Sequence, residues 1–588
     1  MTTQLYAEVG RKGVTIRLAP FRERVGGQGP LRKILNALTV TEKFHPGCPR
    51  GVARQIRHAY METRGANAAI TVPRAKAALF LRPRPGAGKA PLLDGARAGT
   101  GENAALPLPR RLDPARLAIE VPLYTYQEAV VEYLCGGPFS AESMEAHRGV
   151  AYVQMDTGLG KSRVGLAVIA RLGEPALVVV PTEAIGEQWL EEMAEVYPEL
   201  VGGFYHNAPK GSKKALPCPA THDVVVVIVN TLRDKPPEFM EGYGVFILDE
   251  AHEYHSPCNQ RVLWLAQTRA VLGLSATPLE RPDGLDAYVC LHLGPPVYPK
   301  DIPGFDAEEV SFKGEVRALA YTGHPAHCVT EERGGTMSAI CTIGNVLGDP
   351  ARLRLVVAEV ERLYYMHERA PASELARLGL GPRPASAATP THPAGEVRRH
   401  GVFVFAETRD FLPLLQSALQ ERFGAENILA PELEETAPKS PAVTVLRGGV
   451  AKGAVSGARK AGAHIVLVTY GFGRRGLSLP DMTAELMATP RRHGTRQIVG
   501  RVLRRGSDES IVRQFVDIID VCTGLHGQFT DRNKVYKEKG YPVTKTAISW
   551  KEHYEELVEP SEIKEAPEAY TFADLSLEDL LAAAMGDT

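Results

Sequence analysis

The chain has 588 residues, which at about 150 residues per domain suggests about four domains. Apolar residues make up 44% and charged residues 23%, close to globular averages, which argues against wholesale disorder. The 68 Lys and Arg residues nearly balance the 69 Asp and Glu residues, and the resulting net charge of −1 taken alone argues against a nucleic-acid-binding protein.

The charge is unevenly distributed along the chain. Residues 1–120 contain 21 Lys and Arg but 8 Asp and Glu, whereas residues 551–588 contain 2 and 11. A basic head indicates a polyanionic partner, and a solvated arm with a solubilising tail is an equally good alternative. The longest apolar run is far shorter than the ~20 residues that span a bilayer, and the cysteines form no C-x-x-C pair. We therefore expect a soluble intracellular protein.

The texture of the sequence predicts its organisation. We expect a basic accessory domain at 1–120 with a linker at about 83–110, α/β regions at 121–300 and 341–545, a connector at 301–340, a flexible insertion at about 369–397, and an acidic tail at 546–588.

Short β-branched runs are the expected strands. They are Val150–Gln154, Ala176–Val180, Val224–Val229, Val245–Leu248 and Leu272–Leu274, then Val402–Phe405, Val443–Leu446, Ile465–Thr469 and Glu485–Ala488. Apolar strands that alternate with helical segments are typical of parallel sheets covered on both faces. The predicted fold class is therefore α/β, with two similar halves in tandem.

The strongest local signal is a glycine-rich segment that follows the first strand and opens a helix. Its residues are Met155, Asp156, Thr157, Gly158, Leu159, Gly160, Lys161 and Ser162. Glycines allow backbone N–H groups to surround phosphate oxygens, Lys161 can reach the β- and γ-phosphates, and the Ser162 hydroxyl can bind Mg²⁺. Met155 stands where the phosphate-loop pattern has glycine, so an ordinary turn is the alternative.

A second signal ends the strand at Val245–Leu248. Asp249 and Glu250 follow it directly, 88 residues after Lys161, within the tetrapeptide DEAH. A carboxylate at the carboxyl end of a strand can hold hydrated Mg²⁺, and its neighbour can orient or deprotonate water. Capping of the next helix is the alternative. Together the two segments predict ATP hydrolysis.

The ordered set of motifs resembles the superfamily 2 helicases. It consists of TGLGKS (157–162), PTEAIGEQW (181–189), DEAH (249–252), SATP (275–278), VFVFAETRDF (402–411), VTYGFGRRGLSLP (468–480) and QIVGRVLRR (497–505). The resemblance implies two tandem RecA-like lobes. The segments 273–298, 312–323 and 515–541 resemble helicases of the xeroderma pigmentosum group B type and of large DNA viruses, including the poxvirus transcript-release helicase.

The resemblance also implies roles for individual residues. Gln127 would read the adenine edge, Ser275 and Thr277 would couple the lobes, and Asp249 and Ser162 would hold Mg²⁺. Gln497, Arg501 and Arg504 are expected on one helix face, where the guanidinium groups would reach the γ-phosphate as arginine fingers; a solvated basic face is the alternative. The implied nucleic-acid contacts are Thr182, Asn230, Thr231, Thr469 and Gly476.

Two positions depart from the pattern of the family. Tyr124 replaces an arginine near Gln127, which weakens the adenine assignment, and Ser478 replaces a common aspartate, which puts lobe coupling in doubt.

We predict an ATP- and Mg²⁺-dependent DNA helicase or translocase in which ATP binds between the lobes. The 3′→5′ direction is implied only by the resembled branch. The alternatives are a translocase that releases transcripts or displaces proteins without separating strands, and a non-catalytic nucleic-acid scaffold built on a degenerate motor. The expected partners are single- or double-stranded DNA, an RNA–DNA hybrid or the transcription machinery. We expect a monomer or weak oligomer in the nucleus or a viral replication compartment.

Overall fold

The computed structural model divides the chain into two compact units, Met1–Val310 and Ser311–Thr588. The residues it describes are 7–10, 13–17, 29–42, 54–57, 60–63, 69–75, 97–98, 108–145, 148–206, 216–256, 258–281, 283–307, 309–333, 336–365, 400–423, 443–446, 465–473, 479, 481–492, 494–503 and 511–553. The expected insertion at about 369–397 lies outside these residues, as does most of the linker at 83–110.

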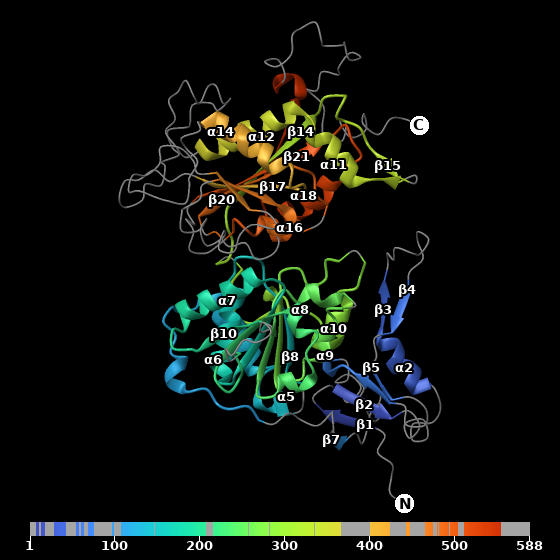
Figure 1. Ribbon diagram of the computed structural model, residues 1–588, viewed down its shortest axis with the longest axis vertical. Coiled ribbons are helices and arrows are strands. Elements are labelled where there is room, and N and C mark those ends of the chain that lie inside the picture. Colours follow the sequence, from blue (N-terminus) through green and yellow to red (C-terminus); the bar gives the residue numbers. More distant parts are fainter. Residues whose placement is uncertain are drawn as a thin grey trace, which may run out of the picture. The chain divides into compact units, whose positions relative to one another are not determined.

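The first unit is built on a six-stranded parallel sheet in the order β10-β11-β9-β12-β13-β8 (Figure 1). Its strands are β8 (Val150–Gln154), β9 (Ala176–Val180), β10 (Gly202–Tyr205), β11 (Val224–Ile228), β12 (Val245–Leu248) and β13 (Ala270–Ser275). The main helices are α4 (Thr125–Gly136), α5 (Ala141–Glu145), α6 (Lys161–Leu172), α7 (Glu183–Val196), α8 (Val229–Leu232), α9 (Arg261–Trp264) and α10 (Ala287–Leu293). Two apolar clusters, one on each face of the sheet, bury the alternating side chains of the strands.

The order of the strands gathers three sequence motifs at one edge. β12, β13 and β8 are consecutive neighbours, with Leu248 beside Gly273 and Ser275 beside Gln154. Because all three strands run in parallel, the segments that follow them leave the sheet at the same edge. The glycine-rich loop, the DEAH segment and the SATP segment, which are far apart in sequence, therefore converge.

The second unit contains a seven-stranded parallel sheet in the order β18-β19-β17-β20-β21-β14-β22. Its strands are β14 (Gly314–Thr322), β17 (Gly401–Ala406), β18 (Val443–Leu446), β19 (Ile465–Thr469), β20 (Met482–Met487), β21 (Arg513–Asp520) and β22 (Val543–Ser549). The described helices are α11 (Ala339–Leu347), α12 (Pro350–Tyr365), α14 (Phe411–Phe423), α16 (Tyr470–Gly473), α17 (Thr495–Val499) and α18 (Gln528–Glu538). β14 lies inside the expected connector at 301–340 and pairs with β21 and β22 in the second sheet.

A small β-rich part precedes the first sheet. It contains β1 (Ala7–Gly10), β2 (Gly13–Arg17), β5 (Tyr60–Thr63), β6 (Ala69–Val72) and β7 (Arg97–Ala98) in a mixed sheet, the pair β3 (Thr39–Glu42) and β4 (Arg54–Arg57), and helix α2 (Gly29–Ala37). Val40 packs against Tyr288 and Leu291 of α10, and the buried Arg74 donates to the carbonyl oxygen of Thr268. These contacts attach the basic head to the rest of the first unit.

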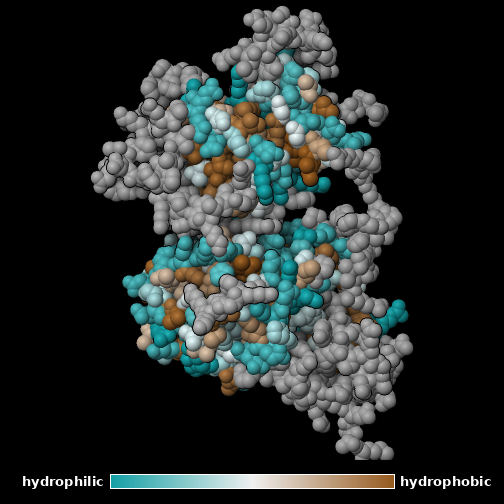
Figure 2. Space-filling model, viewed as in Figure 1, coloured by the Kyte–Doolittle hydropathy of each residue, from teal (hydrophilic) through white to brown (hydrophobic). Residues whose placement is uncertain are grey.

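The predicted α/β class with two tandem RecA-like lobes is confirmed by the two parallel sheets with their helices. Figure 2 shows hydrophilic side chains over much of the described surface, with brown apolar areas between them. Within the described ranges, no helix is long and apolar enough to cross a membrane.

Candidate functional site

The loop between β8 and α6 has a backbone that requires glycine. Gly158 and Gly160 have φ values of 92° and 72°, in the left-handed region that other residues avoid. A Cβ atom on Gly160 would lie 2.4 Å from Nε2 of Gln127, so a side chain there would displace that amide. The Thr157 hydroxyl oxygen is buried and has no hydrogen-bond partner among the residues that the structure describes. Such a loop, ending at a helix N-terminus, has the shape and the donors that suit a phosphate group.

Lys161 lies at the first position of α6 and faces the DEAH segment. Its Nζ atom is 3.6 Å from Oε1 of Glu250, and both side chains are largely buried. Glu250 has φ 48° and is the one non-glycine residue with positive φ in the described part of the chain. Left-handed backbone at such a residue costs about 1–3 kcal/mol and is concentrated at functional sites. The strained turn brings the Glu250 carboxylate to the phosphate-loop lysine.

Asp249 forms a hydrogen bond with a residue of helix α7. Its Oδ2 atom accepts a hydrogen bond from Nε1 of Trp189 on α7 at 2.8 Å, and its Oδ1 atom accepts from the backbone N–H of Glu250 at 2.9 Å. Burial, followed by the nearby Glu250 charge, raises the pKa of Asp249 to about 6, although Lys161 opposes the shift. A cation bound at this carboxylate would relieve the cost of burying its charge.

The Ser162 hydroxyl also meets α7. It donates a hydrogen bond to Oε2 of Glu192 at 2.5 Å, and Oε1 of the same carboxylate accepts from Nε2 of Gln188 at 2.8 Å. Sequence reasoning identified Ser162 and Asp249 but missed their partners Glu192 and Trp189. The spacing of three residues between positions 189 and 192, which places both side chains on one helix face, was the available signal.

A hydrogen-bond chain joins the DEAH and SATP segments. His252 Nδ1 lies 2.9 Å from the Ser275 hydroxyl, which accepts from the backbone N–H of Thr277 at 3.0 Å. All three residues are buried. Of the expected coupling residues, Ser275 therefore contacts the segment that carries the two acidic residues, and Thr277 is joined to that segment through Ser275.

Gln127 is buried against the phosphate loop. Its Nε2 atom donates to the carbonyl oxygen of Leu159 at 3.0 Å, and its Oε1 atom accepts from the backbone N–H of Tyr124 at 3.1 Å. The nitrogen and the oxygen of the Gln127 amide therefore both form hydrogen bonds within the protein, and the bond to Leu159 stabilises the loop. Reading of the adenine edge by Gln127 stays a prediction.

The residues expected at the γ-phosphate lie in the second unit. α17 carries Gln497 but ends at Val499, so the expected helix through position 504 is wrong; Arg501 follows in a turn, its N–H bonded to the Ile498 carbonyl at 2.8 Å. Gly500, a poor helix former, directly follows the helix. Gln497 and Arg501 are both 3% exposed. Arg504 lies outside the described residues.

The expected nucleic-acid contacts occupy strand and helix ends. In the first unit, Thr182 caps α7 by accepting from the backbone N–H of Ile185 at 3.4 Å, while Asn230 is exposed and Thr231 half-buried on α8. In the second unit, Thr469 ends β19 and is buried. Gly476 falls outside the described residues.

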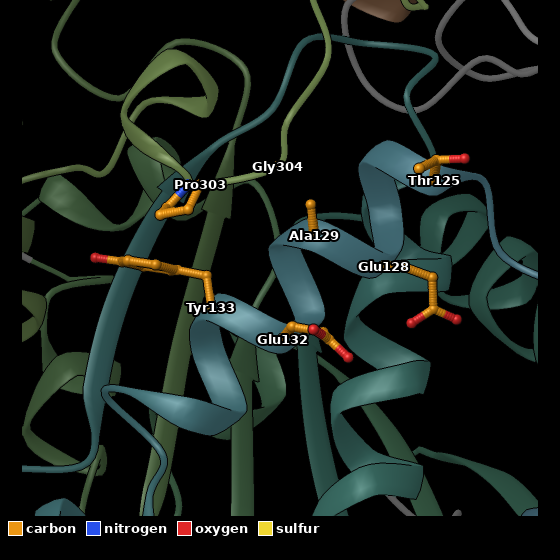
Figure 3. Close-up of a pocket in the computed structure, with 7 residues that line it drawn as sticks. All are labelled: Thr125, Glu128, Ala129, Glu132, Tyr133, Pro303 and Gly304. Carbon is orange, nitrogen blue, oxygen red and sulfur yellow. The ribbon is translucent and has the colours of Figure 1, made fainter.

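A separate hollow of about 550 Å³ lies beside α4 (Figure 3). The ring of Tyr133 extends beneath Pro303, and Glu128 and Glu132 project from the same helix. Its lining residues are Thr125, Glu128, Ala129, Glu132, Tyr133, Pro303 and Gly304. Since none of these belongs to the phosphate loop or the DEAH segment, the chemistry described above lies outside this hollow.

The residues around the loop fit a nucleoside triphosphate with Mg²⁺. Backbone N–H groups and Lys161 suit phosphate oxygens, while the Ser162 hydroxyl and the Asp249 carboxylate supply the oxygen ligands that Mg²⁺ prefers. Glu250 stands next to them as a second carboxylate that can accept a proton from water.

Comparisons with known proteins agree with this geometry. The family described as "Type III restriction enzyme, res subunit" matches residues 120–280. The "Putative ATP-dependent RNA helicase QP509L" of African swine fever virus is 39% identical over 439 residues, 74% of this chain and 76% of that protein. The "DNA 3'-5' translocase XPB2" of Sulfurisphaera tokodaii is 28% identical over 171 residues, 28% of this chain and 35% of that protein.

The chain was also compared with solved structures. "S. cerevisiae Dbp5 bound to RNA and ADP BeF3" is 12% identical, with a TM-score of 0.42, and the match covers 74% of this chain and 96% of that chain. The identity and coverage of the African swine fever virus relative carry the assignment. The chain belongs to the superfamily 2 helicases, an ATP-dependent, nucleic-acid-binding family, among its viral and XPB-like members.

Proposed function

We propose that this protein is an ATP-dependent DNA translocase with helicase activity that moves 3′→5′. The observation that carries the proposal is the cluster of Lys161, Asp249 and Glu250, in which the lysine lies 3.6 Å from the second carboxylate. A scaffold that only clamps nucleic acid needs neither a strained Glu250 nor a phosphate-loop lysine facing it. The cluster therefore favours a working ATPase over a degenerate motor.

The chain's own groups divide the work in this proposal. Lys161 and the loop N–H groups bind the phosphates, and Glu250 orients the attacking water and accepts its proton. Ser162 and Asp249 would hold Mg²⁺, which when bound would supply positive charge against the β- and γ-phosphates. Gln497, Arg501 and Arg504 of the second unit would complete the site when the lobes close, so that hydrolysis drives the lobes apart and along the strand.

The proposed track is DNA, gripped mainly through its phosphates at Thr182, Asn230, Thr231, Thr469 and Gly476. The name of the Sulfurisphaera tokodaii relative describes a 3′–5′ DNA translocase, which supports this choice, whereas the name of the African swine fever virus relative describes a putative RNA helicase. The basic residues of the 1–120 domain supply positive charge that suits a polyanion of either kind.

ATP hydrolysis by the full chain tests the proposal. Rates are measured without nucleic acid and with single-stranded DNA, double-stranded DNA and single-stranded RNA, and Glu250→Gln serves as the inactive control. We expect DNA to stimulate the wild-type rate and the variant to lose it. Stimulation by RNA alone would move the track to RNA, and equal, negligible rates in every condition would overturn the motor assignment.

Strand displacement separates the helicase from the second candidate, a translocase that releases transcripts or proteins. Duplexes with a 3′ or a 5′ single-stranded overhang are incubated with the protein and ATP. We expect displacement only from the 3′ overhang. DNA-stimulated hydrolysis without displacement from either substrate would instead favour the translocase.

A further inference from the structure

Helix α7 holds both groups that the proposed function assigns to Mg²⁺. Trp189 donates to Asp249 at 2.8 Å, and Glu192 accepts from Ser162 at 2.5 Å. The two residues are three positions apart and therefore lie on one face of the helix. α7 also packs tightly on α6, because a Cβ atom on Gly165 would fall 2.5 Å from the Trp189 ring. The helix is therefore fixed against the loop that carries Ser162.

The direction of the Ser162 hydroxyl hydrogen decides what its oxygen can do. A serine that binds a cation uses an oxygen lone pair, so its hydrogen must point to an acceptor elsewhere. Here that acceptor is Glu192, while the two oxygens of Asp249 already accept from Trp189 and from the Glu250 backbone. Gln188 donates to the other oxygen of Glu192 and fixes the plane of its carboxylate.

We propose that Glu192 is a positioning residue for the Mg²⁺ site, which takes the Ser162 hydroxyl hydrogen and so turns the oxygen lone pairs toward the metal. Its negative charge adds to that of Asp249 without occupying a coordination position. The proposal rests on the proposed ATPase function. It names a determinant of metal affinity that lies outside the helicase motifs of the sequence. Partners of this kind that act through a ligand alter metal affinity about 10- to 100-fold when removed.

Binding of a fluorescent ADP analogue to the full chain, as a function of Mg²⁺ concentration, tests the proposal without relying on turnover. For Glu192→Ala we expect the Mg²⁺ concentration at half-saturation to rise about 10-fold or more. Affinity for the metal-free analogue, measured with EDTA, should stay unchanged, because the proposed role of Glu192 is to position a ligand of the metal. Glu192→Gln keeps an oxygen acceptor for Ser162 and should recover part of the loss.

Glu187→Ala is the matched control, since it removes a glutamate from the exposed face of the same helix. It should leave the Mg²⁺ dependence unchanged. A Glu192→Ala variant that is folded by circular dichroism and binds with the wild-type Mg²⁺ dependence would overturn the proposal. Equal weakening with and without Mg²⁺ would also overturn it, because a general distortion of the loop predicts that result.

A double-mutant cycle isolates the contact itself. If Glu192 acts through the Ser162 hydroxyl, Glu192→Ala should have little further effect in a Ser162→Ala background. Additive effects of the two substitutions would contradict the proposed route. Failure of the wild-type chain to bind the nucleotide at all would instead refute the ATPase function, so the two failures are distinguishable.

Discussion

The two parallel sheets differ in where they place their charged residues. In the first unit, Lys161, Asp249 and Glu250 lie where strands end and helices begin, and a strained backbone brings two of them together. In the second unit, charges are paired inside the structure: Arg532 contacts Asp517 at 2.8 Å, with both side chains at most 1% exposed. Charges at the rim of a sheet can meet a ligand, whereas charges inside it can only meet each other.

Glu485 extends this difference. It lies on β20 of the second sheet and is 1% exposed, and neither of its carboxylate oxygens has a hydrogen-bond partner within the part of the chain that the structure describes. Burial, followed by repulsion from Asp517, raises the pKa of Glu485 well above its ordinary value of 4.5, while Arg501 opposes the shift. Four predictions test the comparison between the charges at the strand ends of the first sheet and the buried charges of the second unit.

Lys161→Ala should produce the largest effect, a loss of about 10³-fold in kcat/KM for ATP, or about 4 kcal/mol of transition-state stabilisation. The thermal midpoint should change little, because the lysine serves the ligand more than the fold. Steady-state hydrolysis and a thermal melt measure both quantities, with Lys313→Ala at an exposed position as the control. A folded Lys161→Ala variant with the wild-type kcat/KM would show that Lys161 does not act on the bound nucleotide, and would contradict the role given to the strand ends of the first sheet.

Asp517→Asn should act on stability. Breaking a buried ion pair leaves the Arg532 charge without its partner and costs about 3–5 kcal/mol. Equilibrium urea unfolding measures the loss. Asp531→Asn, which removes a partner of the exposed Lys534, should change the free energy of unfolding by at most about 1 kcal/mol. Similar losses in the two variants would show that the buried pair contributes no more than a surface pair.

Glu485→Gln should change how stability depends on pH. The raised folded-state pKa means that the stabilising contribution of the protonated Glu485 is complete below pH 4.5 and is lost as pH rises through the folded-state pKa. Glutamine carries no titrating proton. The free energy of unfolding of the variant should therefore rise relative to that of the wild type by at most about 1.4 kcal/mol per pH unit above pH 4.5. Unfolding free energies at several pH values from 5 to about 8 measure the difference; parallel curves for the two proteins would contradict the burial effect.

Glu250→Gly should produce the smallest of the four main effects on stability, an increase of about 1 kcal/mol, because glycine adopts φ 48° without strain. Hydrolysis should be lost in the same variant. Glu250→Gln keeps the strained backbone, so it should lose activity without the backbone gain in stability. Equal melting temperatures for the glycine and glutamine variants would show that no strain is stored at this position.

Much of the architecture follows from local sequence. Val150–Gln154, Ala176–Val180, Val245–Leu248, Val443–Leu446 and Ile465–Thr469 are strands with the predicted bounds. Their apolar residues need burial on both faces, and that requirement selects a parallel sheet with helices on each side. Strands with charged residues escaped prediction: β14, β21 and β22 carry Arg, Glu, Asp or Lys among their apolar residues.

The candidate site was predictable in its residue types but not in all of its partners. The glycine-rich loop is one continuous segment, and the acidic pair is another. In each of them the residue types alone indicate the chemistry. The helix expected to carry Arg501 was wrong in extent, since it ends at Val499. Gly500 favours an end at this point, and the turn that follows carries the buried Val502, which packs in the same apolar cluster as Val499.

The sequence by itself determined the two sheets, the phosphate loop, the DEAH segment and the helicase family, because each depends on short runs of residues with a fixed order. Only the tertiary structure decided that Trp189 donates to Asp249, that Glu192 accepts from Ser162, and that Glu485 is buried with no hydrogen-bond partner among the described residues. Those contacts join residues distant in sequence whose meeting depends on strand order and helix packing. The physical reason is that local periodicity specifies which face of an element is apolar, whereas the side chain that it meets is set by the packing of the whole unit.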